Sequence, residues 1–113
     1  MKTDLTKAIV CSIDFTESSK DALKWAVSLA ALHKTHLTVL FTYRLVNSRN
    51  GEVMDLRRKI EENASRNFLL LENEILKGSG VPYDFKMEVG FVSNRIADYA
   101  KRNGASFLVM GKR

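Results

Sequence analysis

The sequence predicts an α/β protein in which one domain, residues 1–113, forms an open parallel β-sheet with helices on both faces. Short apolar, β-branched runs alternate along the chain with longer segments whose apolar residues recur every three or four positions. Apolar residues make up 45% of the chain and charged residues 27%, as in ordinary globular proteins. A chain of 113 residues is long enough for one hydrophobic core.

Four segments have the pattern of strands. Residues 7–14 and 36–43 are short, largely apolar and β-branched runs, typical of strands buried in a sheet. Apolar and charged residues alternate over residues 83–89, which predicts a strand at the sheet edge with one face toward water. Residues 107–110, Phe-Leu-Val-Met, form the fourth predicted strand.

The segments between these strands are predicted helices. The first begins after capping residues at 16–19, ends at about His33, and has apolar spacing at Ala22, Ala26, Leu29, Ala30 and His33. A long second helix ends before Gly78 and carries its apolar face on Ile60, Ala64, Phe68, Leu71 and Ile75. A short third helix begins at Ser93, ends at 103–104, and would pack through Ile96, Ala97 and Ala100.

Composition argues against several classes of protein. No run is long and apolar enough for a membrane helix and the first residues lack the apolar core of a secretion signal, so a cytoplasmic location is expected. The net charge of +5 is mild and mixed with acidic residues, so nucleic-acid binding is not expected, and residues 57–59 are interpreted as a solvated helix face. His33 and His36 do not make a metal-ligand pair, because one ends a helix and the other begins a strand.

Two kinds of side chain that often act at binding sites are interpreted as packing residues instead. Cys11 lies in an apolar run and is expected to be a small core residue rather than a nucleophile. Trp25, Tyr43 and Tyr99 are expected to pack rather than to stack on a ligand.

Ligands of open parallel sheets bind beyond the carboxyl ends of the strands, where the strand order reverses. The residues that follow the four predicted strands are the candidates, namely Asp14 and Phe15, Thr42 and Tyr43, Gly90, and residues 111–113. Asp14 could accept hydrogen bonds from a ribose hydroxyl or an exocyclic amine, or it could cap the following turn. Gly111 with Lys112 could approach a phosphate, or it could belong to a solvated chain end.

Two other doubly wound folds fit these loops poorly. A flavodoxin needs a Gly- and Thr-rich loop after the first strand, whereas residues 15–19 contain no glycine. A phospho-receiver domain needs paired acids after the first strand and an aspartate after the third, where this chain has Val89 and Gly90.

The order of segments resembles the universal stress protein family. The first strand with Asp14, followed by Ser-Ser-Lys-Asp-Ala-Leu-Lys-Trp-Ala at 18–26, is similar to the opening of its members. The segment 104–111, Gly-Ala-Ser-Phe-Leu-Val-Met-Gly, resembles their "Gly-Ala-Asp-Leu-Ile-Val-Met-Gly". The resemblance spans about residues 7–111 and implies a Rossmann-like fold, of the adenine nucleotide alpha hydrolase-like type, with strand order 3-2-1-4.

The resemblance also implies a nucleotide site for ATP or AMP in the crevice between the first and fourth strands. In ATP-binding members, the first-strand aspartate and the end of the second strand hold the adenosine, and Gly111 matches the first glycine of a phosphate motif. The implied nucleotide-binding positions are Ile13, Asp14, Phe15, Thr42, Met110, Gly111 and Lys112.

The family pattern continues past residue 113 with further glycines, a final helix and a fifth strand, so nucleotide binding by this chain is expected to be weak or absent. The fourth strand is then expected to be an open apolar edge, which favours a homodimer. Three hypotheses follow: a stress-response module that binds adenine nucleotide, a nucleotide-independent protein-interaction module of the same fold, and an enzyme. The last is not expected, since no base, nucleophile or metal set is visible.

Overall fold

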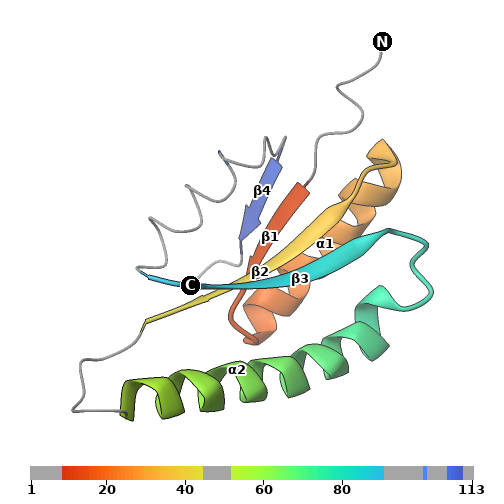
Figure 1. Cartoon of the computed structure of the whole chain (residues 1–113). Coiled ribbons are helices and arrows are strands. Elements are labelled where there is room, and N and C mark those ends of the chain that lie inside the picture. Colours follow the sequence, from red (N-terminus) through yellow and green to blue (C-terminus); the bar gives the residue numbers. More distant parts are fainter. Residues whose placement is uncertain (1–8, 45–51, 91–100, 102–106, 111–113) are drawn as a thin grey trace.

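The computed structural model describes residues 9–44, 52–90, 101 and 107–110. They form a four-stranded parallel sheet in the order β3-β2-β1-β4, as the family resemblance implied (Figure 1). The elements in chain order are β1 (Ile9–Ile13), α1 (Glu17–His33), β2 (Leu37–Tyr43), α2 (Glu52–Leu71), the π-helical turn η2 (Glu72–Leu76), β3 (Tyr83–Val89) and β4 (Phe107–Met110).

The central strands are β1 and β2, and the sequence predicted both correctly. All five residues of β1 are buried, because β1 lies between β2 and β4 and α1 covers one of its faces. Ile9 pairs with Leu37 and Ile13 with Phe41, so the carboxyl ends of the two strands lie close together. The strand order reverses between β1 and β4, and open α/β sheets bind ligands at such a position.

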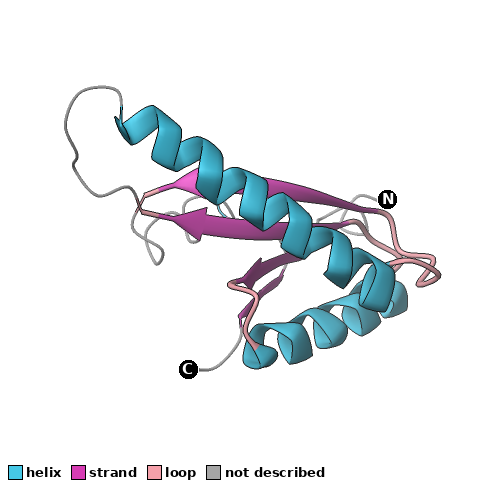
Figure 2. Ribbon diagram, turned by 90° about the horizontal axis from the view of Figure 1, so that it is seen from below, coloured by secondary structure: helices cyan, strands magenta, loops and turns pink. Residues whose placement is uncertain are grey.

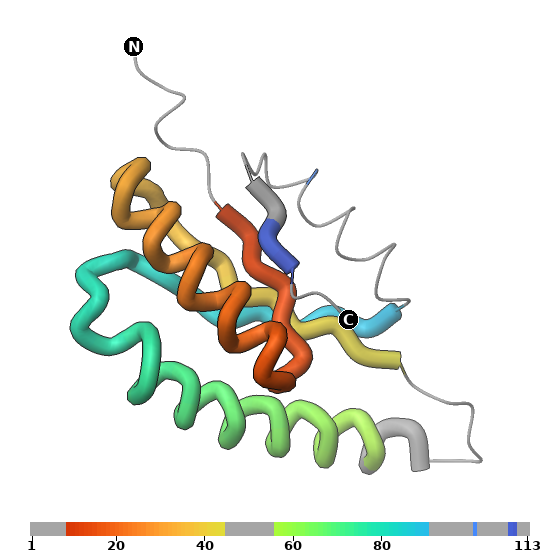
Figure 3. The backbone as a smooth tube through the Cα atoms, turned by 180° about the vertical axis from the view of Figure 1, so that it is seen from behind, coloured from red at the N-terminus to blue at the C-terminus, as the bar shows by residue number. Residues whose placement is uncertain are grey.

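Helices α1 and α2 cover the same face of the sheet (Figure 3). Alternate residues of the central strands, including Cys11 and Val39, share one core with Leu23 of α1 and Phe68 of α2. Figure 2 shows the two helices from below, with α2 alongside β3. The predicted third helix, with Ser93 and its packing residues, lies outside the described residues.

The predicted boundaries of α1 are confirmed. Thr16 caps the helix, since its hydroxyl oxygen accepts a hydrogen bond from the Ser19 amide at 3.2 Å. After His33, Lys34 takes the left-handed conformation with φ 53° and its amide hydrogen-bonds back to the last turn. Ala22, Ala26 and Ala30 are buried as predicted, whereas His33 is exposed.

Trp25 on α1 contradicts the interpretation as a packing residue. Its side chain is 63% exposed, because position 25 lies on the flank of α1 that turns away from the sheet. Leu23, which the predicted apolar set omitted, is fully buried instead. Tyr43 is buried, which confirms its interpretation, and Tyr99 lies outside the described residues.

The second helix ends with a feature that the sequence did not predict. It continues past Leu71 as the π-helical turn η2 before Gly78, which has φ 82°. A π-helical turn holds more residues than an α-helical one, so the apolar face shifts along the sequence. The regular spacing predicted that Ile75 lies on the core face, and Ile75 is partly buried. Because of the shift, its neighbour Leu76 is fully buried.

The outer strands have the predicted bounds. β3 lies at the sheet edge, where Phe85 stacks on Phe68 of α2 with ring centroids 4.2 Å apart and an interplanar angle of 4°. β4 pairs with β1 on one side, and within the described residues no strand pairs with its other side. Among the described residues, no helix is long and apolar enough to cross a membrane.

Candidate functional site

Those inferred site residues that the structure describes lie where the parallel strands end. Phe41 is the partner of Ile13, so Asp14 and Thr42 follow one row further along neighbouring strands. Met110 ends β4 on the other side of β1, opposite Ser12, and is 50% exposed. Gly111 and Lys112, the residues assigned to phosphate, lie outside the described residues.

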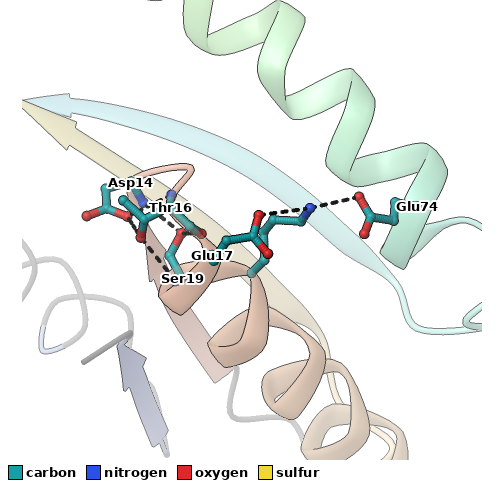
Figure 4. A network of polar contacts seen from close by, with 6 residues as sticks. Asp14, Thr16, Glu17, Ser19 and Glu74 are labelled. Atoms are coloured by element: carbon teal, nitrogen blue, oxygen red, sulfur yellow. Dashed lines mark hydrogen bonds and ion pairs between the residues drawn. The ribbon is translucent and has the colours of Figure 1, made fainter. Parts of the chain in front are cut away.

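The Asp14 carboxylate is held in a hydrogen-bonded turn at the start of α1 (Figure 4). Its Oδ1 atom accepts from the Thr16 amide at 3.1 Å and from the Thr16 hydroxyl at 2.5 Å. The Asp14 amide in turn donates to Ser19 Oγ at 3.3 Å, and that hydroxyl donates to the Thr16 carbonyl at 3.1 Å. Asp14 therefore caps the turn, which was one of its two interpretations, and the same bonds fix the direction of its carboxylate.

Ile13 and Phe15 flank Asp14 and turn their side chains toward the core. Ile13 is buried in the core that α1 and α2 cover. Phe15 packs against that core and its ring centroid lies 5.3 Å from that of Phe41. A ligand at the strand ends would therefore meet the backbone of these two residues rather than their side chains.

The backbone of Phe15 has φ 65°, which is unusual for a bulky residue and costs about 1–3 kcal/mol. Packing of the ring against Phe41 helps to hold this conformation. The left-handed residue turns the chain sharply between β1 and α1, and this brings Thr16 back to the Asp14 carboxylate.

Thr42 and Tyr43 end β2 on opposite faces of the sheet, because side chains alternate along a strand. Thr42 is buried, 7% exposed, on the face that the two helices do not cover. The carbonyl of Tyr43 accepts a hydrogen bond from the Gly90 amide at 2.9 Å. Gly90 has φ 146°, where a side chain would be strained, so this glycine suits the exit from β3.

Tyr43 also makes a side-chain contact that the sequence did not reveal. Its hydroxyl donates a hydrogen bond to Glu61 of α2, and Arg57 Nε lies 3.3 Å from the same carboxylate oxygen of Glu61. Burial, followed by the hydrogen bond to Glu61, raises the pKa of Tyr43 to about 12. Only the four-residue spacing of Arg57 and Glu61 could have been read from the sequence, as a helical ion pair.

A second polar contact joins the two helices near the Asp14 turn (Figure 4). The Lys20 ammonium lies 3.2 Å from the Glu74 carboxylate of η2 and 3.5 Å from that of Glu17. The hydrogen bond to Glu74 is the main cause that raises the pKa of Lys20. Lys20 thus links the first turn of α1 to the end of the second helix rather than facing the strand ends.

Cys11 is confirmed as a core residue. Its side chain is fully buried, and desolvation raises the pKa of the thiol to about 12. A thiol with this pKa does not form the thiolate that nucleophilic chemistry requires. Within the described part of the chain, no three His, Cys, Asp or Glu side chains are grouped closely enough to hold a metal ion.

The strand order, with the candidate residues at the carboxyl ends of the strands, is that of an open parallel α/β protein. The sequence profile of the Universal stress protein family matches residues 6–113. The chain therefore belongs to the universal stress protein family, as the resemblance indicated. No curated protein sequence matches the chain.

Solved structures share the fold at low sequence identity. A universal stress protein family member from Burkholderia pseudomallei has a TM-score of 0.81 at 20% identity, and the match covers 98% of this chain and 85% of that one. A family protein from Arabidopsis thaliana, solved with AMP bound, has a TM-score of 0.66 at 14% identity, with 94% and 76% covered. A universal stress protein in complex with cAMP has a TM-score of 0.59 at 18% identity, with 91% and 70% covered.

Proposed function

We propose that the chain is a universal stress protein module that binds an adenine nucleotide, such as ATP or AMP, at the carboxyl edge of the sheet. The observation that carries the proposal is the placement of Asp14 and Thr42 side by side on neighbouring strands, next to the point where the strand order reverses. The structural neighbours solved with AMP and with cAMP support the choice of ligand class.

Asp14 would recognise the adenosine part of the ligand. Its carboxylate is a hydrogen-bond acceptor, and the two bonds from Thr16 reach its Oδ1 atom. A ribose hydroxyl or the exocyclic amine of adenine could donate to it in a charge-assisted hydrogen bond. Because the turn already orients the carboxylate, little conformational entropy would be lost on binding.

Isothermal titration calorimetry of the 113-residue chain with AMP, cAMP and ATP tests the proposal. Asp14→Asn keeps an acceptor for the turn but removes the charge, and we expect it to weaken binding by about tenfold or more. Asp21→Asn, which changes an exposed acid of α1, is the matched control and should bind like the wild type. Absence of binding to all three nucleotides would contradict the proposal.

The same titration measures the affinity. A comparison of ATP with AMP shows how much the additional phosphates contribute, which bears on Gly111 and Lys112.

A specific observation favours the nucleotide-independent alternative, a protein-interaction module of the same fold. Trp25 and Leu32 are 63% and 74% exposed on one flank of α1, seven residues apart, with the partly buried Leu29 between them. Exposed apolar residues in a row are typical of a contact surface. The proposal that the chain forms a homodimer is supported by this flank.

We propose a binding role rather than a catalytic one, in stress response or its regulation, and in the cytoplasm. The buried thiol of Cys11 is a poor nucleophile because desolvation raises its pKa. A cytoplasmic location is in keeping with this single cysteine, which has no second cysteine in the chain to pair with.

A further inference from the structure

Three aromatic rings form a continuous ladder beneath the carboxyl edge of the sheet. The ring of Phe15 contacts that of Phe41 at a centroid distance of 5.3 Å, and Phe41 stacks on Tyr43 at 5.8 Å with an interplanar angle of 19°. Phe41 and Tyr43 are two residues apart on β2 and therefore share a face. The ladder joins the turn after β1 to the last residue of β2.

The two end residues of the ladder, Tyr43 and Phe15, each have a further structural role. At one end, the Tyr43 hydroxyl donates to Glu61 of α2, and Glu61 also pairs with Arg57. At the other end, Phe15 holds the left-handed conformation that closes the Asp14 turn. An aromatic pair of this kind contributes about 0.5–1.5 kcal/mol beyond its buried area.

The ladder lies directly under the segments that carry the proposed site. Asp14 adjoins Phe15 in sequence, Thr42 stands between Phe41 and Tyr43, and Gly90 donates its amide hydrogen to the Tyr43 carbonyl. The side chains of the ladder face the helices, whereas Thr42 faces the other side of the sheet. The rings therefore do not touch the ligand position and act on it only through the backbone.

The structure contains a matched contact at the other end of the sheet. Tyr83, the first residue of β3, donates its hydroxyl hydrogen to Glu72 at 2.6 Å, and its ring lies edge-on to Phe68. Both tyrosine–glutamate contacts join the sheet to the second helix, but only Tyr43 lies at the carboxyl edge. Removing each tyrosine hydroxyl in turn therefore distinguishes a general loss of stability from a specific effect on the proposed site.

We propose that Phe15, Phe41 and Tyr43 are positioning residues that hold the ends of β1 and β2 in register for the nucleotide, and that Glu61 of α2 anchors this ladder. The proposal rests on the proposed function for its ligand. The positioning itself can be measured without a ligand.

Amide hydrogen exchange and AMP titration of the 113-residue chain test the proposal. The reporter amides are those of Gly90, Asp14 and Thr16, whose hydrogen bonds lie at the strand ends. We compare Tyr43→Phe, which removes only the hydroxyl, with Tyr83→Phe as the matched control. Urea unfolding measures the stability loss of both variants, which we expect to be about 1 kcal/mol each.

Two further variants keep the test decisive. Phe41→Leu breaks the ladder in the middle while keeping an apolar core residue, so the Asp14 and Thr16 amides should exchange faster than in the wild type. Glu61→Gln keeps an oxygen that can accept from Tyr43, so exchange at the Gly90 amide should remain close to that of the wild type.

We expect Tyr43→Phe to speed exchange at the strand ends and to weaken AMP binding about fivefold, with neither effect in Tyr83→Phe. Equal exchange rates at the reporter amides in the two tyrosine variants would contradict the proposal that the three rings position the strand ends. If the wild type binds no AMP while the exchange contrast persists, the proposed function fails and the positioning of the strand ends is supported.

Discussion

The hydroxyl of Tyr43, the last residue of β2, donates a hydrogen bond to the Glu61 carboxylate on α2. Burial and this bond raise the pKa of Tyr43 to about 12, from 10.0 for a free tyrosine. In the unfolded chain the phenol loses its proton near pH 10, whereas in the folded chain it keeps that proton to about pH 12. The folded state thus binds one more proton between these values, and stability must fall as the pH rises.

This relationship predicts how the stability depends on alkaline pH. The stabilisation from the neutral Tyr43 should be complete below about pH 10 and lost progressively toward pH 12. Urea unfolding of the wild type and of Tyr43→Phe between pH 8 and 11.5, roughly the range on either side of the unfolded pKa, measures it. The wild type should lose stability more steeply than the variant, and parallel curves would contradict the prediction.

A second prediction concerns the cap of α1. Thr16→Ala removes the acceptor for the Ser19 amide and the hydroxyl that donates to Asp14, so it should destabilise the protein by about 1–2 kcal/mol. Ser28→Ala, at an exposed position of the same helix, is the control and should leave the stability within about 0.5 kcal/mol. The measurement is chemical unfolding, and equal effects of the two substitutions would argue against the cap.

Most of the fold could be predicted from the sequence because its signals are local. The apolar runs at β1 and β2, the alternation along β3 and the capping residues around Thr16 each determine their own element. The parallel pairing followed from the alternation of strands with helices, and the strand order from the family resemblance.

Other features depend on contacts between residues far apart in the sequence. The contact between Tyr43 and Glu61 joins β2 to α2 over a sequence separation of 18 residues, and no spacing rule encodes it. The π-helical turn interrupts the regular helical period, so Leu76 could not be assigned to the core. Trp25 was misplaced because its size suggests burial, whereas its position on the helix decides its exposure.

The candidate site was predictable at the level of strand ends. Asp14 and Thr42 lie on neighbouring strands as the topology requires. The hydrogen bond from the Thr16 amide to the Asp14 carboxylate, by contrast, depends on the left-handed backbone of Phe15. The amino-acid composition does not indicate that conformation.

The stacked rings of Phe68 and Phe85 predict that replacing Phe68, the residue of this pair that lies on α2, by alanine causes a large loss of stability. Phe68 is buried and shares the core with β1 and β2, so Phe68→Ala should cost about 3–5 kcal/mol. The neighbouring Leu70 is 66% exposed, and Leu70→Ala should change the stability by less than about 0.5 kcal/mol. Thermal or chemical unfolding gives both values, and similar losses for both would contradict the placement of α2.

The buried thiol predicts slow modification. Burial raises the pKa of Cys11 from 9.0 to about 12, so at neutral pH the thiolate is roughly a thousandfold scarcer than for a free thiol. Reaction with a thiol-specific disulfide reagent should be slow in buffer and fast in denaturing urea. Rapid labelling of the folded chain, confirmed as folded by circular dichroism, would show that β1 is accessible to solvent.

Trp25 allows the self-association proposal to be measured directly, because it is the one tryptophan of the chain. As its side chain is 63% exposed, dilute protein should emit at the long wavelength of a solvated indole. If the row formed by Trp25, Leu29 and Leu32 is the contact surface of a homodimer, the emission should shift to shorter wavelength as the concentration rises. Sedimentation velocity should show the dimer over the same range.

Leu32→Ser distinguishes this surface from the edge of β4, since it removes an exposed apolar side chain from the flank of α1 without changing a strand. The variant should stay monomeric at concentrations where the wild type is a dimer. Its Trp25 emission should remain at long wavelength throughout. A wild type that dimerises with no change in Trp25 emission would instead assign the contact to another surface.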